Sequence, residues 1–334
     1  MINNVPRILL ARYPSLIQPL SVLEPLGNAG GTSGSRLWRF DSARGPLVVR
    51  AWPIDGPSLA RLRWIHQILF QVQDLRFIPV PERDRQGVSI QEHAGRLWDL
   101  SPWMPGSADP GRPPPTLRLR SAFAALARFH QRTRHVGRSL DVSPGLRARL
   151  TEMDALLGGG FNTLEDALNR APADPLSDLA RHWLGLAIRL TLPVADSIRR
   201  LADQRRTLIP CLRDVRPDHF LFEGNQVTGL VDFGALGVET VSADLARLLT
   251  EGVGPDRLAR AEALNAYAKV RTLNDDEAAL IAPFERSAAL LRGARWIRWH
   301  FIDGKTFDDS DAVRRGLERA VEGVRGLTLE SGLG

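Results

Sequence analysis

Apolar and polar residues alternate along most of the first hundred positions, which is typical of β-strands with one buried face. Strands are predicted on this basis at residues 22–26, 36–40, 46–52, 88–91 and 96–100. The turn-forming residues 41–45 join the second and third of these segments as a hairpin. Residues 58–72 instead carry apolar side chains at spacings of three and four, which predicts a helix. The first part of the chain is therefore expected to be β-rich with one helix.

A proline-rich stretch at residues 102–115 has the composition of a linker. Beyond it, apolar residues recur at helical spacing, apart from one β-type segment at residues 208–233. Helices are predicted at residues 117–132, 176–204, 257–270, 276–300 and 311–324. We therefore predict an α+β protein of two lobes. A small β-rich N-terminal lobe spans 1–101, a hinge and linker span 102–115, and a larger, mostly helical lobe spans 116–334.

The composition is that of a soluble globular protein, with 43% hydrophobic and 25% charged residues in a chain of 334. No run of about 18 apolar residues occurs, so a membrane is not expected as a partner. The N-terminal residues lack the pattern of a secretory signal. Cys211 is the only cysteine, which excludes an internal disulfide and fits a reducing compartment. We therefore expect a cytoplasmic protein.

The charge distribution argues against a nucleic-acid partner. The 44 basic and 38 acidic residues leave a formal net charge of only +6. Lysine occurs only as Lys269 and Lys305, so nearly all of the basic residues are arginines, and these are scattered along the chain. A nucleic-acid-binding surface would instead show a cluster of basic residues on one face. No feature of the sequence indicates the oligomeric state.

Two aspartates lie at the two ends of a predicted hairpin in the helical lobe. Asp214 follows an apolar run, and Asp232 comes after the strand 227–231, directly before Phe233-Gly234. Phosphoryl transfer needs one carboxylate that orients the acceptor hydroxyl and takes its proton, and another that holds Mg²⁺ against the phosphates. A hairpin can bring two such side chains together. Taken singly, each aspartate would also fit a turn-capping position.

The segment 208–233 is similar to the catalytic core of the aminoglycoside phosphotransferase and choline kinase superfamily, whose members have a bilobal protein-kinase-like fold. The matching motifs are Leu212-Arg213-Asp214, Asp232-Phe233-Gly234, the Asp-Leu-Ala-like segment 242–246, the hinge 100–106 and the Leu-His-like segment 126–130. The resemblance extends from about residue 23 to about residue 249. It implies an ATP- and Mg²⁺-dependent transfer of a phosphoryl group to a hydroxyl of a small molecule, such as an aminoglycoside, a choline-like compound or another metabolite. Asp214 would then be the catalytic base and Asp232 a metal ligand.

Two departures from the family's pattern leave a second interpretation open. The family's metal-binding asparagine falls on His219, and imidazole is a poor ligand for Mg²⁺. His219 could hold the metal, bond to Asp214 or a phosphate, or pack at the start of a strand. The helix 58–72 contains no acidic residue that could pair with a phosphate-binding cation, and His66 and Gln67 are its closest polar candidates. The alternative is a catalytically degenerate kinase-like protein that binds a nucleotide or a protein partner.

The resemblance also implies a nucleotide site in the N-terminal lobe. A glycine-rich stretch lies where the family has its phosphate-covering loop, although a flexible hairpin loop would have the same composition. Its candidate residues are Gly27, Gly30, Gly31, Ser33 and Gly34. Arg50 occupies the place of the phosphate-binding lysine, where the other interpretation is an exposed arginine at a strand end. Adenine would be held at the hinge by the C=O of Ser101 and the N–H of Trp103.

The acceptor is less determined by the sequence. Trp296, Trp299, His300 and Asp303 precede the acidic run 308–311. In the resembled family this region often faces a cationic substrate, and carboxylates with aromatic rings suit an amino sugar or a quaternary ammonium. A tryptophan-anchored core helix followed by a solvated helix start fits the same residues. The sequence therefore predicts a small-molecule acceptor without identifying it.

Overall fold

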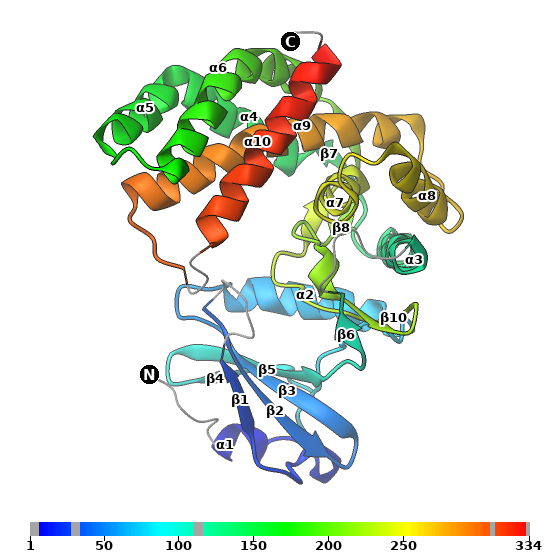
Figure 1. Cartoon of the computed structure of the whole chain (residues 1–334). Helices are drawn as coiled ribbons and strands as arrows, with labels where there is room; N and C mark the ends of the chain where they lie inside the picture. The colour runs from blue at the N-terminus through cyan, green and yellow to red at the C-terminus, as the bar shows by residue number, and fades with distance from the viewer. Residues whose placement is uncertain (1–6, 28–33, 110–115, 308–310, 332–334) are drawn as a thin grey trace.

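The protein folds into two lobes, which lie one above the other in Figure 1. The computed structural model describes residues 7–27, 34–109, 116–307 and 311–331. The smaller, N-terminal lobe contains an antiparallel sheet, and the larger lobe is mostly helical. The predicted two-lobed α+β fold class is therefore confirmed. Among the residues that the structure describes, no helix is both long and apolar enough to span a lipid bilayer.

Five antiparallel strands form the sheet of the N-terminal lobe, in the order β1-β2-β3-β5-β4. They are β1 (Glu24–Gly27), β2 (Arg36–Ser42), β3 (Gly45–Ala51), β4 (Ile90–His93) and β5 (Arg96–Pro102). All five are predicted from the alternation pattern, although β1 and β4 each begin two residues later than expected. The short helix α1 (Arg7–Leu10) is not predicted, and its Leu9 and Leu10 complete the core against Trp38 and Phe40.

The alternation along β3 divides its side chains between two environments. Leu47 and Val49 are buried in the core of the lobe, whereas Val48 and Arg50 face a cavity between the lobes. The predicted helix is α2 (Leu59–Gln71), and Ser58 caps its first turn by accepting the N–H of Arg61 at 3.2 Å. In Figure 1, α2 lies between the sheet and the larger lobe.

The two lobes are joined through a tight hinge after β5. The short strand β6 (Ser107–Ala108) pairs with β9 (Phe220–Glu223) of the larger lobe, and β9 pairs in turn with β10 (Gln226–Leu230). Gly106 has a φ of 91°, and a Cβ there would lie 2.7 Å from the carbonyl oxygen of Phe222. Glycine is therefore required where the hinge approaches the hairpin.

Eight helices are described in the larger lobe. They are α3 (Thr116–Thr133), α4 (Pro144–Ala155), α5 (Phe161–Arg170), α6 (Pro175–Ala202), α7 (Val241–Leu248), α8 (Arg257–Ala268), α9 (Asp275–Ile297) and α10 (Ala312–Ser331). The predicted helices α3, α6, α8, α9 and α10 begin within one residue of their expected starts, whereas the sequence does not predict α4, α5 and α7. A small sheet in the order β11-β8-β7 supports the helices. Its strands are β7 (Ser139–Val142), β8 (Arg205–Cys211) and β11 (Gly237–Glu239).

Candidate active site

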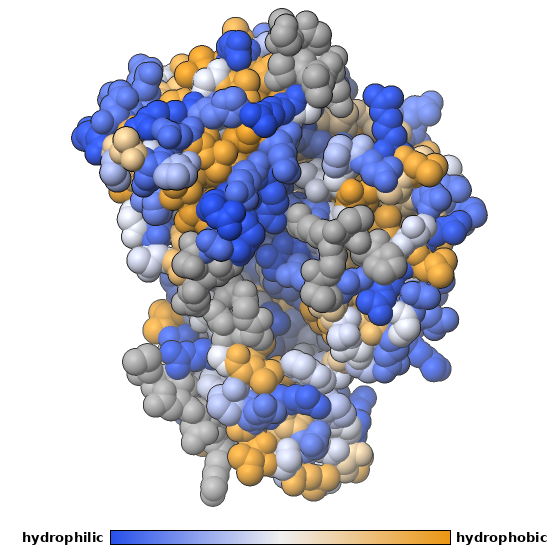
Figure 2. Space-filling model, viewed as in Figure 1, coloured by the Kyte–Doolittle hydropathy of each residue, from blue (hydrophilic) through white to orange (hydrophobic). Residues whose placement is uncertain are grey.

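A cavity of about 460 Å³ lies between the lobes, which is within the usual range for small-molecule sites. Figure 2 shows the hollow between the lobes, with hydrophilic side chains on its floor. The sheet, α2 and the hinge form one side, and the residues around the β9–β10 hairpin form the other. Five of the predicted site residues line this single cavity: Arg50, Ser101, Trp103, His219 and Asp232.

The predicted phosphate-covering loop connects β1 to β2. Gly27 and Gly34 border it with φ values of 62° and 72°, a region that favours glycine. Gly30, Gly31 and Ser33 lie outside the described residues. Ser35, directly after the loop, lines the cavity and is buried. The described residue that follows the loop therefore lies at the cavity, and contact of the loop with a phosphate stays a prediction.

Asp232 and His219 meet at the edge of the cavity. Oδ2 of Asp232 lies 3.8 Å from Nε2 of His219, and about half of the Asp232 side chain is exposed. Asp232 has a φ of 65°, a strained conformation for a residue other than glycine. Its Oδ1 accepts the N–H of Gly234 at 3.4 Å, so the turn-capping interpretation also describes part of its environment.

His219 is held by a second charged neighbour. Its Nε2 accepts a hydrogen bond from Nε of Arg216 at 3.1 Å, and its imidazole is buried. Burial, assisted by the charge of Arg216, lowers the pKa of His219, although the carboxylates of Asp232 and Asp214 oppose this. The imidazole is therefore neutral near pH 7, with its proton on Nδ1.

Asp214 lies in a loop whose backbone is fixed by a buried carboxylate. In α7, the two oxygens of Asp244 accept the backbone N–H groups of Leu212 and Arg213, each at 2.7 Å. Arg213 has a φ of 65°, which is unfavourable for a residue with a side chain. Asp244 therefore stabilises the turn that presents Asp214.

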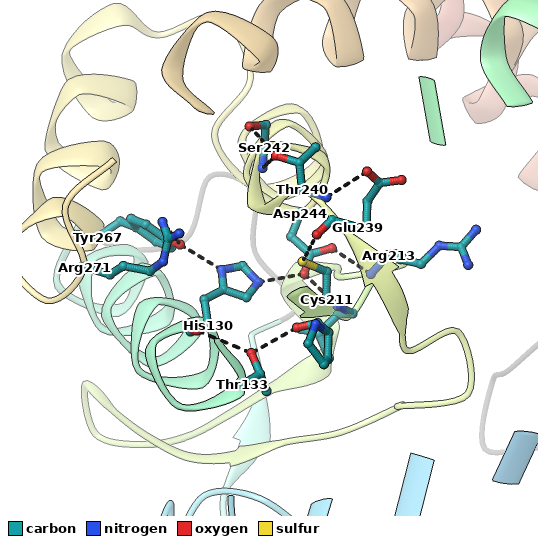
Figure 3. A network of polar contacts seen from close by, with 12 residues as sticks. His130, Thr133, Cys211, Arg213, Glu239, Thr240, Ser242, Asp244, Tyr267 and Arg271 are labelled. Atoms are coloured by element: carbon teal, nitrogen blue, oxygen red, sulfur yellow. Dashed lines mark hydrogen bonds and ion pairs between the residues drawn. The ribbon is translucent and has the colours of Figure 1, made fainter. Parts of the chain in front are cut away.

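A chain of hydrogen bonds extends from Asp244 into the core (Figure 3). Nε2 of His130 lies 3.0 Å from Oδ2 of Asp244, and Nδ1 of His130 lies 2.8 Å from the hydroxyl oxygen of Tyr267. Burial lowers the pKa of His130 even though Asp244 raises it, and burial raises the pKa of the Tyr267 hydroxyl. A neutral imidazole that donates to Asp244 and accepts from Tyr267 satisfies all three groups.

Cys211 belongs to the same buried cluster. The ligand atoms of His130, Cys211 and Asp244 lie within 4.8 Å of one another, a spacing that a metal site would also show. Burial raises the pKa of the Cys211 thiol, whereas a metal would need the thiolate. The thiol is also close to the carbonyl oxygen of Glu239, at 3.4 Å. Because each group already has a protein partner, we assign this cluster to holding the Asp214 loop in place.

The carboxylate of Asp214 is bound to an arginine. Its Oδ1 accepts a hydrogen bond from Nη2 of Arg247, in α7, at 2.7 Å. The Asp214 side chain is 49% exposed, so its carboxylate is accessible from the solvent. The sequence does not indicate this ion pair, because 33 positions separate the two residues.

An acid that the sequence analysis missed lies behind Arg50. Asp99 of β5 pairs with Arg50 in the strand register, and its buried carboxylate accepts the indole N–H of Trp52 at 2.6 Å. Nε2 of His66, on α2, lies 3.6 Å from the same oxygen. Burial alone would raise the pKa of Asp99, but His66, Arg50 and Trp52 together hold it below its usual value.

Arg50 itself makes a different contact. Its guanidinium stacks on the ring of Trp52, 4.8 Å from the ring centroid, and no carboxylate lies within 4 Å of it in the described part of the chain. The absence of an acid from α2 is thus confirmed, and the nearby negative charge comes from Asp99 on β5 instead. The position of Asp99 inside the otherwise apolar strand 96–100 is the sequence signal that could have identified this acid.

The backbone groups predicted to hold adenine at the hinge are already used in the pairing of β5 with β3. The N–H of Trp103 donates to the carbonyl oxygen of Pro46 at 2.9 Å, so it is already occupied. Ser101 pairs with Val48 in the same ladder, and bonded pairs recur at every second residue, so its polar groups also point toward β3. The prediction for Ser101 and Trp103 is therefore wrong, because the ladder continues past the expected strand end.

The predicted acceptor aromatics are partly buried and pack against one another beside the core. Trp296 and Trp299 pack together at a centroid distance of 5.3 Å, and both contact Phe307. A Cβ at Gly316 of α10 would lie 2.2 Å from the Trp296 ring, so this ring packs directly on α10. Within the predicted acidic run, residues 308–310 lie outside the described part, and Asp311 pairs with Arg314 at 3.1 Å. The core-helix interpretation is the one that the structure supports.

Several solved structures have the same fold. An aminoglycoside phosphotransferase from Alicyclobacillus acidocaldarius superposes with a TM-score of 0.68 at 14% identity, over 99% of this chain and 96% of that chain. A spectinomycin phosphotransferase in complex with ADP and spectinomycin gives 0.66 at 11% identity, over 96% of each chain. An amicoumacin kinase in complex with AMP-PNP and Ca²⁺ gives 0.61 at 12% identity, over 95% of this chain and 92% of that chain.

These identities are low, so the structural similarities show the fold alone. No curated protein matches the sequence. The sequence of residues 26–282, however, matches the model of the phosphotransferase enzyme family. This match covers most of the chain and includes Arg50, the loop of Asp214, and Asp232. The chain therefore belongs to the phosphotransferase enzyme family.

Proposed function

We propose that the protein transfers the γ-phosphoryl group of ATP to a hydroxyl of a small molecule, with Mg²⁺ as the metal. The observation that carries this proposal is the position of Asp214 and Asp232 around one buried imidazole. Asp232 lies 3.8 Å from Nε2 of His219 and lines a cavity of suitable volume. The carboxylates of Asp232, Asp218 and Asp214, in decreasing order, all act to raise the pKa of His219 against the effect of burial. Asp214 itself lies outside the residues that line the cavity, but its carboxylate is half exposed, and phosphoryl transfer needs a second carboxylate of this kind.

Asp232 fits the role of metal ligand better than His219 does. Carboxylate oxygens are the ligands that Mg²⁺ prefers, and the Asp232 carboxylate is accessible from the cavity. The Nε2 lone pair of His219 already accepts from Arg216. We therefore propose that Asp232 holds Mg²⁺ and that His219 positions Asp232 and Arg216. When bound, Mg²⁺ would neutralise charge on the phosphates.

The same cavity fits ATP. The C=O of Pro102 and the N–H of Met104 lie on the edge of the hinge that is not paired with β3, and both residues line the cavity. We propose that this pair holds adenine in place of Ser101 and Trp103. Arg50 lies near the end of β3 and also lines the cavity. Its planar guanidinium is suited to oxyanions and would bind the phosphates.

In the proposed reaction, the acceptor hydroxyl donates a hydrogen bond to Asp214 and gives up its proton to this carboxylate. The hydroxyl oxygen forms a bond to the γ-phosphorus while the bond from that phosphorus to the β,γ-bridging oxygen breaks. ADP leaves with the bridging oxygen. Asp244 and His130 contribute by keeping the loop of Asp214 in its strained turn.

Transfer of radioactive phosphate from γ-labelled ATP to pooled amino sugars, sugars, amino alcohols and hydroxy acids tests the proposal. We expect labelled product with the wild type and none with Asp214→Asn, which keeps the shape but cannot take the proton. Equal labelling by both proteins would remove Asp214 from the mechanism.

A degenerate nucleotide-binding protein is the second candidate. The observation in its favour is that Arg247 already neutralises Asp214 while His219 occupies the family's asparagine position. A degenerate protein of this kind would bind nucleotide with similar strength in the wild type and in Asp214→Asn. Neither protein would then give a labelled product.

A further inference from the structure

The surroundings of Asp214 are basic. Arg247 binds its carboxylate, and Arg213 precedes it in the chain. Arg213 lies close enough to Arg61 of α2 for its charge to lower the pKa of Arg61, after the larger effect of burial. Arg149 of α4 is half-buried and is repelled by Arg247. Of these four arginines, only Arg247 has a carboxylate within 4 Å among the described residues, and that carboxylate is Asp214 itself.

Two of these arginines carry buried donors that the protein does not satisfy. Nε of Arg149 and Nε of Arg247 are buried and have no hydrogen-bond acceptor among the described residues. Such an arrangement is unfavourable for the free protein, because a buried N–H that loses water needs another partner. The side chain of Arg247 is nevertheless 32% exposed, so a ligand can reach its guanidinium.

A shared carboxylate brings the two helices together. Glu239, at the end of β11, accepts the Ser143 hydroxyl and the Gly145 N–H at the start of α4, each at 2.6 Å. It also accepts the N–H of Thr240, the cap of α7, at 2.8 Å. The starts of α4 and α7 are therefore fastened to each other, and both arginines lie in the second turn of their helices.

Arg149 has no carboxylate within 4 Å among the described residues. Burial lowers the pKa of Arg149 to about 10. Glu239 and Glu152 oppose this shift, and weaker repulsion from Arg247 and Arg295 adds to it. Its Nη1 bonds only the Gly145 carbonyl oxygen of its own helix, at 3.3 Å, and its guanidinium lies over the Phe284 ring. A second cation behind Arg247 would repel a positively charged acceptor and attract a negatively charged one.

We propose that the acceptor carries an anionic group, a carboxylate or a phosphate, in addition to the hydroxyl that is phosphorylated, and that Arg247 and Arg149 bind this group. The inference rests on the proposed function. Guanidinium groups bind both kinds of oxyanion with paired hydrogen bonds. The anion takes Arg247 away from Asp214 Oδ1, which leaves that oxygen free to accept the hydroxyl proton. This acceptor differs from the amino sugar or quaternary ammonium that acidic and aromatic residues at 296–311 would suit.

A set of four compounds with one carbon skeleton tests the charge preference without knowledge of the natural acceptor. They are glycerate, glycerol 3-phosphate, glycerol and the cationic 2-amino-1,3-propanediol. Binding is measured by calorimetry on the full chain, with and without saturating Mg·ADP. We expect at least one of the two anions to bind about tenfold or more tightly than glycerol, and the cation to bind no better than glycerol. Which anion binds tighter distinguishes a carboxylate from a phosphate.

Three variants connect this binding to the arginines. Arg247→Gln and Arg149→Gln should each remove the preference for the anion, whereas Arg257→Gln, a matched loss of charge at the exposed start of α8, should keep it. Arg149→Lys keeps the charge and should bind the anion more tightly than Arg149→Gln does. Thermal unfolding verifies that each variant is folded.

Equal or tighter binding of the cation, no binding of either anion, or unchanged anion binding in both glutamine variants would overturn the proposal. If the wild type binds the anion but does not bind Mg·ADP, the proposed function is contradicted and the anion site is not.

Discussion

Arg50 and Asp99 face each other across strands β3 and β5, at the point where the cavity meets the sheet. The negative charge near Arg50 therefore comes from the neighbouring strand and not from helix α2. His66 connects α2 to this pair, since its Nε2 lies 3.6 Å from Asp99 and its Nδ1 lies 2.9 Å from the Ser89 hydroxyl. Asp99 thus connects the sheet and the helix at the residue proposed to bind the phosphates.

Asp99→Ala should destabilise the protein by about 2 kcal/mol, because the buried indole N–H of Trp52 loses its acceptor. Asp99→Asn keeps an oxygen in place and should cost less. Urea unfolding followed by tryptophan fluorescence gives both values. An alanine variant as stable as the wild type would mean that the Trp52 bond contributes nothing measurable.

Replacing Asp244 by alanine should lower kcat more than it weakens nucleotide binding. The backbone N–H groups of Leu212 and Arg213 lose their acceptor, so the turn that presents Asp214 relaxes. Misplacement of a catalytic group by about 1 Å can cost about 100-fold in rate. Steady-state kinetics of phosphate transfer, with a calorimetric ADP titration as the control, separates the two effects. An equal loss in both would point to general unfolding of the lobe.

The hinge assignment predicts different results for two changes at one position. Met104→Pro removes the N–H proposed for adenine and should weaken ATP binding by about tenfold, whereas Met104→Leu keeps the N–H and should bind nearly as well. Fluorescence titration with an ATP analogue measures both. If the two variants bind alike, adenine is not held by this backbone group.

The stability of the protein should fall as the pH decreases below about 6.5, the usual pKa of histidine in an unfolded chain. Burial lowers the pKa of both His130 and His219 in the folded state, so the unfolded state takes up protons first. The stabilisation is complete above the unfolded pKa and is lost as the pH falls through the folded values. Urea unfolding at several pH values between 5 and 8 measures this slope.

His130→Gln is the matched variant for this slope, because glutamine can donate to Asp244 and accept from Tyr267 but does not titrate in this range. The free energy of unfolding of the variant should depend less steeply on pH, because only the contribution of His219 remains. A slope as steep as that of the wild type would contradict the assignment of a depressed pKa to His130.

Local patterns were sufficient to predict the elements that form the frame of the site. The helical spacing within α9 and the alternation in β3 depend only on nearby residues, and both elements are present where expected. Helix α4 was missed because its position depends on distant contacts. Glu239 binds Ser143 and Gly145 across more than 90 positions in the sequence, and no local pattern records such a pairing.

The candidate site shows the same limit. The cavity residues Arg50, His219 and Asp232 follow from motif positions, but their partners depend on strand register and side-chain direction. Asp99 becomes a neighbour of Arg50 only once β3 and β5 are aligned. The hinge prediction used the N–H of Trp103, which bonds to Pro46 because the ladder extends beyond the apolar pattern.

A calorimetric titration of ATP, with and without Mg²⁺, tests the central claim most directly. We predict that the wild type binds ATP more tightly with Mg²⁺, that Asp232→Asn loses this enhancement, and that Asp203→Asn, a loss of the same charge at a distant exposed position, retains it. Absence of ATP binding under every condition, or an equal effect of Mg²⁺ on the wild type and Asp232→Asn, would contradict the account.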